Sequence, residues 1–320
     1  MEALLCSAPQ ILMEGSVYER LRRHPEIIFD PFIAHAGLVY PPVGSALLEE
    51  VHREYWEVGQ RYRLPMIALT DTWRASQERV ERSGFARFPV NEDNVRFLTG
   101  LRSRFMDNRP PHPSPVLIAG QIGPYGDAYR PLEAPGRQQA ERLHAWQVEA
   151  LAGSGVDLLA ACTLPAFPEA QAIAGLFSRT GLPYFLSFVI RPQGTLLDGT
   201  LLYQAIETID QQAVFPPFGY SINCVHPGAM LEGLRNLEAA RPGLSRRIAG
   251  FQANTSPRSP EELDGLVELE SEAPATLAAQ MLQVQQQYGV RILGGCCGCG
   301  TQHIEHLARC MTSGCKPRDE

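Results

Sequence analysis

The sequence lacks the features that mark several large classes of proteins. Its 320 residues contain no uninterrupted apolar stretch near the ~18 residues that a membrane-spanning helix needs. The N-terminus shows no basic head followed by a long apolar core, so we expect no signal peptide and a cytoplasmic protein. Basic runs are missing and the formal net charge is −7, so we expect neither nucleic acid nor a membrane as a partner.

Cysteine is present at eight positions of a protein that we expect to be cytoplasmic. In that compartment, cysteines are expected to be free thiols or metal ligands rather than disulfides. The eight cysteines are Cys6, Cys162, Cys224, Cys296, Cys297, Cys299, Cys310 and Cys315.

Short apolar segments recur along the chain and alternate with amphipathic, helix-like segments. The segments that we predict as strands are mostly non-alternating, which is typical of strands covered on both faces. They are 10–13, 66–70, 116–120, 156–160, 184–189, 219–224, 247–252 and 290–293. Helical spacing is found at 44–61, 137–151, 168–177, 200–209 and 275–288.

This alternation predicts an α/β fold of the (β/α)8 TIM-barrel type, with residues 1–320 as a single domain. The alternative is a doubly wound open sheet. The eight predicted strands, and the absence of Gly-x-Gly-x-x-Gly after an early strand, favour the barrel.

Three cysteines follow predicted strands, at the end of a barrel where catalytic residues are found. Cys224 ends the sixth predicted strand, and Cys296 and Cys297 follow the eighth. Neighbouring residues of a regular strand point to opposite faces, but the glycines of Gly294-Gly-Cys-Cys-Gly298 allow the chain to curl and aim both sulfurs at one point. Three thiolates form a zinc (Zn2+) site with one open position. The competing interpretation of the vicinal pair is two small buried hydrophobes.

These motifs resemble those of a known family. Gly294-Gly-Cys-Cys-Gly298, followed by His303-Ile304, is similar to the signature of zinc-dependent homocysteine S-methyltransferases. Ser221-Ile-Asn-Cys-Val-His-Pro227 resembles the segment that carries that family's first zinc cysteine, and Gly120-Gln-Ile-Gly-Pro-Tyr125 and Thr70-Asp-Thr-Trp-Arg-Ala-Ser76 fit it in order.

The resemblance implies a TIM barrel with zinc on Cys224, Cys296 and Cys297 and a substrate thiol as the fourth ligand. The implied reaction moves a methyl group from a sulfonium donor, S-methylmethionine or S-adenosylmethionine, to homocysteine or a related thiol. Betaine and folate are less expected donors, since the family members that use them carry a longer C-terminal arm or further domains. Both partners are small molecules, and the sequence makes no prediction about the oligomeric state.

Two positions depart from the family's pattern. The family opens its barrel with Asp-Gly and places a glutamate at the end of the fourth strand, both for the substrate's amino group. This chain has Glu14-Gly15 and Cys162 instead. We therefore predict an acceptor other than ordinary homocysteine. Cys162 has three interpretations: a small apolar filler, part of a pocket for a different thiol, or a fourth zinc ligand. Cys299 is a spare ligand candidate.

Three polar residues complete the candidate set. Thr72 and Asn254, at the ends of the second and seventh predicted strands, are candidates for substrate binding. Asn223 precedes a predicted ligand and either contacts substrate, orients the ligand or stabilises a turn. Two other functions stay open: a zinc-binding barrel that has lost catalysis and acts in binding or regulation, and an iron–sulfur or thiol redox protein.

Overall fold

The computed structural model describes residues 4–5, 8–107, 113–258, 262 and 271–313. Cys6 and Cys315 lie outside these described residues. Within them, no helix combines the length and the apolar character that crossing a lipid bilayer requires.

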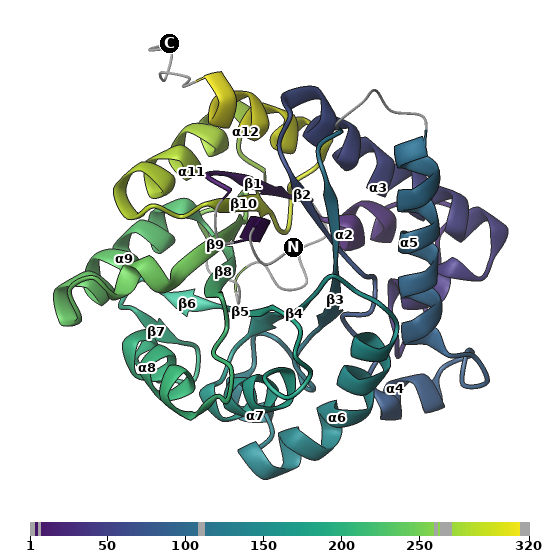
Figure 1. Cartoon of the computed structure of the whole chain (residues 1–320), viewed down its shortest axis with the longest axis horizontal. Coiled ribbons are helices and arrows are strands. Elements are labelled where there is room, and N and C mark those ends of the chain that lie inside the picture. Colours follow the sequence, from purple (N-terminus) through teal and green to yellow (C-terminus); the bar gives the residue numbers. More distant parts are fainter. Residues whose placement is uncertain (1–3, 6–7, 108–112, 259–261, 263–270, 314–320) are drawn as a thin grey trace.

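Eight parallel strands form a closed barrel in the order β1-β10-β9-β8-β5-β4-β3-β2, which confirms the predicted TIM barrel (Figure 1). Each predicted strand segment overlaps one of them. The strands are β1 (Ile11–Met13), β2 (Met66–Leu69), β3 (Val116–Ile122), β4 (Leu158–Leu164), β5 (Tyr184–Phe188), β8 (Gly219–Val225), β9 (Ile248–Ala253) and β10 (Ile292–Gly295). A small antiparallel hairpin, β6 (Ile190–Arg191) and β7 (Thr195–Leu196), follows β5.

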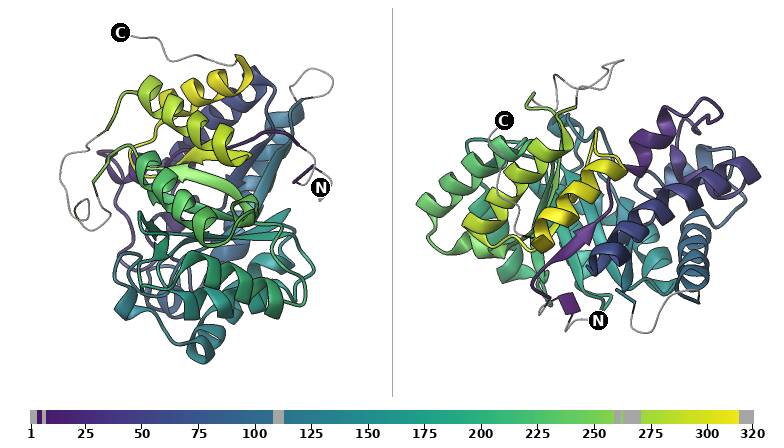
Figure 2. Two further views of the ribbon diagram at one scale, coloured as in Figure 1. Left: turned by 90° about the vertical axis from the view of Figure 1, so that its left-hand side faces the viewer. Right: turned by 90° about the horizontal axis from the view of Figure 1, so that it is seen from above.

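Helices surround the barrel on its outside (Figures 1 and 2). The five helical segments predicted from spacing correspond to α3, α6, α7, α8 and α11. The α-helices are α2 (Val17–Arg22), α3 (Pro42–Tyr62), α4 (Gln77–Arg82), α5 (Val90–Asp107), α6 (Arg137–Gly153), α7 (Phe167–Phe177), α8 (Leu202–Gln212), α9 (Pro227–Ala240), α11 (Pro274–Tyr288) and α12 (Thr301–Ser313). Short 3-10 helices are η1 (His35–Val39), η2 (Pro131–Glu133) and η3 (Leu244–Arg247).

The strands bury side chains on both faces, as their non-alternating sequences predict. In β1, Leu12 belongs to the apolar layer between the strands and the helices, whereas Ile11 and Met13 belong to a second apolar cluster together with Ile67 and Phe185. These packed layers fix the strands, so the loops at the carboxyl ends are held in place relative to one another.

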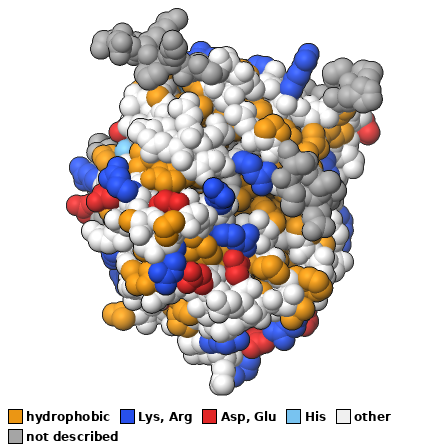
Figure 3. Space-filling view, turned by 60° about the vertical axis from the view of Figure 1, so that its left-hand side comes forward, with side chains coloured by type: hydrophobic (Ala, Val, Ile, Leu, Met, Phe, Trp, Pro, Cys, Tyr) orange, Lys and Arg blue, Asp and Glu red, His pale blue; other side chains and the backbone are white. Residues whose placement is uncertain are grey.

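Charged side chains of both signs are interspersed on the molecular face shown in Figure 3. Among the described residues, this face therefore carries no extended patch of a single charge sign.

Candidate active site

A cavity of about 590 Å³ opens at the carboxyl ends of the strands. Its wall is formed by the residues that end or follow β1, β2, β4, β8, β9 and β10, which is where a barrel presents its reactive groups. The predicted site residues that line it are Glu14, Gly15, Cys162, Asn223, Cys224, Asn254, Cys296 and Cys297.

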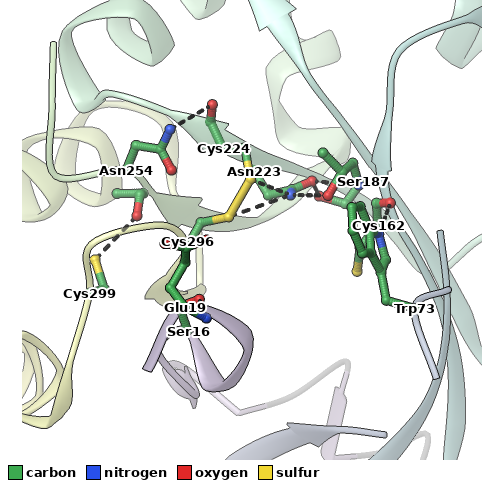
Figure 4. The surroundings of a disulfide bond; sticks show 12 residues. Ser16, Glu19, Trp73, Cys162, Ser187, Asn223, Cys224, Asn254, Cys296 and Cys299 are labelled. Carbon is green, nitrogen blue, oxygen red and sulfur yellow. Dashed lines mark hydrogen bonds between the residues drawn. A yellow bond between two sulfur atoms is a disulfide. The ribbon is translucent and has the colours of Figure 1, made fainter. Parts of the chain in front are cut away.

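Three sulfurs meet in the cavity wall. The Sγ atoms of Cys224, Cys296 and Cys297 all lie within 4.8 Å of one another, although 72 residues separate the first two. The structure joins Cys224 and Cys296 by a disulfide (Figure 4). The expectation of no disulfide is therefore wrong for this pair, because the two strand ends bring their Cα atoms to 5.5 Å, within disulfide range, while the same two sulfurs remain candidates for holding a metal together with Cys297.

The backbone at both cysteine segments takes unusual conformations. Cys224 has a φ of +57°, in the left-handed region, where the register of β8 against β9 shifts. A non-glycine residue there costs about 1–3 kcal/mol. Gly298 has a φ of +84°, and a Cβ atom at this position would overlap the Thr255 side chain. The glycines around Cys296 and Cys297 thus allow the chain to curl as the sequence predicts, whereas the left-handed backbone at Cys224 was not predicted.

Asn223 connects the sulfur cluster to the neighbouring strands. Its Nδ2 donates to Cys224 Sγ at 3.3 Å and lies 3.9 Å from Cys296 Sγ. Its Oδ1 accepts hydrogen bonds from the Thr163 backbone N–H at 2.9 Å and the Ser187 hydroxyl at 2.6 Å. Because every polar atom of this buried amide is engaged, its orientation toward the sulfurs is fixed.

Neither Cys162 nor Cys299 belongs to the sulfur cluster found among the described residues. Cys299 Sγ donates to the Ala253 carbonyl at 3.3 Å, and Cys162 lies on the other side of Asn223 from Cys296 (Figure 4). Burial raises the pKa of the Cys162 thiol and of the Cys299 thiol to about 12. Both side chains are therefore neutral at physiological pH, and of the two only Cys162 lines the cavity.

Glu14 reaches a set of buried donors with its longer side chain. Its Oε1 accepts hydrogen bonds from His52 Nδ1 and Trp56 Nε1, both at 2.8 Å, and its Oε2 accepts one from the Leu69 backbone N–H at 3.2 Å. Only 2% of Glu14 is exposed. Most of the hydrogen-bonding capacity of the Glu14 carboxylate is thus taken up by other residues of the protein.

His52 links Glu14 to two further buried titratable side chains, Asp71 and His35, which the sequence did not predict as a group. Its Nε2 lies 3.2 Å from Asp71 Oδ2, and Asp71 Oδ1 lies 3.3 Å from His35 Nε2. Burial alone would lower the pKa of His52, but Glu14 and Asp71 outweigh it and raise that pKa to about 10. Burial alone would raise the pKa of Asp71, but His52 and His35 lower it. The available signal was a histidine within the apolar stripe of α3.

Of the remaining predicted residues, Gly15 and Asn254 line the cavity and Thr72 lies behind its wall. Thr72 is fully buried, donates to the Gln121 carbonyl at 2.6 Å and is not among the residues that line the cavity. Gly15 lies so close to the chain at Cys299 that a Cβ atom would come within 2.5 Å of its carbonyl oxygen. Asn254 Nδ2 donates to the Cys224 carbonyl at 3.1 Å, while its buried Oδ1 has no hydrogen-bond partner among the described residues.

A (β/α)8 barrel with cysteine sulfurs converging in the wall of a cavity at its carboxyl end has the architecture of a barrel enzyme, and the sulfurs suit thiol or soft-metal chemistry. The sequence model of the family described as homocysteine S-methyltransferase matches residues 11–311. The chain belongs to this family and is a methyltransferase.

The homocysteine S-methyltransferase of Escherichia coli (strain K12) is 28% identical over 318 residues, which cover 93% of this chain and 94% of that protein. Crystal structures of the homocysteine methyltransferase MmuM from Escherichia coli are similar. The oxidized form has a TM-score of 0.74 at 25% identity and covers 96% of this chain and 97% of that one. The metallated form has a TM-score of 0.75 at 24% identity, covering 96% and 98%, and supports the fold.

Proposed function

We propose that the protein transfers a methyl group from a sulfonium donor, S-methylmethionine or S-adenosylmethionine, to the thiol of homocysteine or a related small molecule. The observation that carries this proposal is the meeting of three cysteine sulfurs within 4.8 Å in the wall of the barrel's cavity. The names of the relatives support a thiol acceptor.

The sulfur cluster fits a zinc ion. Three sulfur ligands favour a soft divalent metal over magnesium or calcium, and a catalytic zinc site has three protein ligands and an open position. The Asn223 amide donates toward two of the sulfurs, which favours their thiolate form. Burial and the Glu19 carboxylate raise the pKa of the Cys297 thiol to about 12, so ionisation of this group needs a cation beside it. Coordination by all three cysteines further requires that the Cys224–Cys296 pair be reduced.

Zinc bound here would supply the positive charge that holds the acceptor sulfur as a thiolate, the nucleophilic form of a thiol. The chain's own residues provide alignment. Asn223 holds the sulfurs in one orientation, and the unpartnered Oδ1 of Asn254 accepts a hydrogen bond from a substrate N–H or O–H group. The cavity, of about 590 Å³, would hold the acceptor and the donor together for a single in-line displacement.

Residues on the other side of the cavity form the remaining substrate contacts. We assign Glu14, Gly15 and Cys162 to the wall that faces the acceptor's carbon chain, and Thr72 to support of that wall through the Gln121 carbonyl. With Cys162 neutral and Glu14 bonded to His52, an α-ammonium group gains less stabilisation here than beside two available carboxylates. Homocysteine would then be a weaker acceptor than a related thiol.

The test uses purified protein, reduced with a phosphine and loaded with zinc. We expect one zinc per chain and methyl transfer to at least one of a panel of small thiols, with S-methylmethionine or S-adenosylmethionine as donor. Metal content is measured by mass spectrometry and the thioether product by chromatography. Stoichiometric zinc without transfer from any donor to any thiol would contradict the proposal, and bound iron would contradict the zinc assignment.

A further inference from the structure

Two arginines of the cavity wall lie near the start of α4: Arg74 precedes the helix and Arg79 lies in its first turn. Arg74 Nη1 donates to the Pro124 and Gly126 carbonyls at 3.2 and 2.6 Å. Arg79 donates to the Phe32 and Tyr125 carbonyls, each at 3.2 Å. Both arginines line the same cavity as the sulfur cluster. Their partners are therefore neutral carbonyl groups, which do not compensate two positive charges.

The surrounding carboxylates do not neutralise this pair. Among the described residues, no carboxylate oxygen lies within ion-pair distance of either guanidinium. Asp127 and Glu169 influence Arg74 only from further away. Asp127 accepts a hydrogen bond from the Tyr129 backbone N–H, and Glu169 accepts one from the Tyr125 backbone N–H. Burial, followed by the charge of Arg79, lowers the pKa of Arg74 to about 10. An anion bound between the two guanidinium groups would relieve both effects.

The other carboxylates that line the cavity are engaged by the protein. Glu19 forms ion pairs with Arg22 and Arg23, and Asp30 accepts hydrogen bonds from three backbone N–H groups. The Glu14 carboxylate accepts three hydrogen bonds from the protein, and Asp71 is held between His52 and His35. The Cys162 thiol is neutral. The wall therefore combines carboxylates that are engaged by other residues with two arginines that have no carboxylate partner among the described residues.

We propose that Arg74 and Arg79 form an anion-binding subsite of the cavity, which takes the carboxylate, or a similar oxyanion, of a substrate of methyl transfer. This inference rests on the proposed function and adds the charge class of the substrate. Planar guanidinium groups bind carboxylates through two parallel hydrogen bonds, so the subsite would position the substrate as well as attract it. The anion belongs either to the thiol acceptor or to the sulfonium donor.

The experiment measures kcat/KM with the reduced, zinc-loaded protein in two arms. The first arm holds the donor constant and compares 3-mercaptopropionate, 2-mercaptoethanol and cysteamine, which are anionic, neutral and cationic. The second arm holds the thiol constant and compares S-methylmethionine with trimethylsulfonium, which has no carboxylate. Both arms use the wild type, Arg74→Gln, Arg74→Lys and Arg79→Gln. Arg82→Gln is the matched control, because Arg82 lies on the same helix and pairs with Glu78 at the surface.

We expect a preference of about tenfold or more for the carboxylate-bearing member of one arm. Arg74→Gln and Arg79→Gln should each lower this ratio, Arg74→Lys should retain part of it, and Arg82→Gln should leave it unchanged. The arm in which the ratio responds identifies the molecule that carries the anion. Ratios that are the same in the wild type and in Arg74→Gln in both arms would overturn the subsite.

Failure of the proposed function gives a different result, namely no methyl transfer to any thiol. In that case, thermal shifts of the zinc-loaded protein with 3-mercaptopropionate and 2-mercaptoethanol test the subsite directly. A larger shift with the anionic thiol that is lost in Arg74→Gln supports it. Equal shifts contradict it.

Discussion

The buried His52 connects two carboxylates of the cavity wall, and its replacement by glutamine should destabilise the fold strongly. His52 has no exposed surface, and Glu14 and Asp71 are each 2% exposed. Glutamine still donates a hydrogen bond but carries no charge, so two carboxylates would face each other without their shared cation. Removing one partner of a buried ion pair costs about 3–5 kcal/mol. We expect His52→Gln to lose about 3 kcal/mol of unfolding free energy, which is roughly a hundredfold in the unfolding equilibrium constant.

The pH dependence gives this prediction its sign. The pKa of His52 is about 10 in the folded protein, against the ordinary value of 6.5 for a histidine. Since the folded-state pKa is the higher one, the charged imidazole stabilises the fold fully below about pH 6.5, and this stabilisation is lost as the pH rises toward about 10. The pKa of Asp71 is lowered, so its contribution is present throughout this range and is lost only in acid.

Urea unfolding between pH 6.5 and pH 10, followed by tryptophan fluorescence, measures the difference between wild type and His52→Gln. This difference should shrink by a few kcal/mol across the range. His306→Gln is the control, since among the residues that the structure describes the His306 ring hydrogen-bonds only its own helix, through the Gln302 carbonyl. A wild-type-minus-variant difference that stays constant from pH 6.5 to pH 10 would refute a charged His52 between Glu14 and Asp71.

Three further predictions address the site. Cys297→Ser should lower zinc content and methyl transfer together, measured by metal analysis and product formation, while Cys310→Ser, in α12, should leave both near the wild type. Cys162→Glu should raise kcat/KM for homocysteine about tenfold over Cys162→Ala, because it adds a negative charge for the ammonium group; no gain would contradict the assigned wall. Gly298→Ala, at a φ of +84°, should cost about 1–3 kcal/mol in urea unfolding and reduce zinc content, whereas Gly300→Ala, with open space around its Cα, should do neither.

The barrel could be predicted because its strands are apolar on both faces and its helices are amphipathic. Each of these patterns is local, so short segments such as 219–224 and 290–293 were sufficient to identify strands. The position of Cys224, Cys296 and Cys297 followed from one further rule, that the carboxyl ends of parallel strands meet at one end of the barrel.

The contacts that use tertiary neighbours could not be predicted in this way. Glu14 matched the place of a substrate-binding carboxylate, but one more methylene allows it to reach donors on α3 and β2. His52 lies on α3 at a helical spacing that indicates only burial, and nothing in the sequence pairs it with Asp71. The disulfide between Cys224 and Cys296 likewise depends on the distance between two strand ends, which composition and compartment rules do not contain.

The residues of the cavity wall come from two sets of neighbouring strands of the barrel. The sulfurs, Asn223 and Asn254 come from β8, β10 and the residues after β9, whereas Glu14, Cys162 and Arg74 come from the ends of β1, β4 and the loop after β2. In the closed barrel these two sets, β10-β9-β8 and β4-β3-β2-β1, meet where β1 pairs with β10 and are separated on the other side by β5. Because neither the Glu14 carboxylate nor the Cys162 thiol hydrogen-bonds a sulfur of the cluster among the described residues, we expect substitutions at these two positions to change which thiol is accepted while the sulfur cluster is preserved. Glu14 and Cys162, which depart from the family's pattern while all three cysteines are retained, are therefore what the proposed change of substrate choice, with the chemistry kept, predicts.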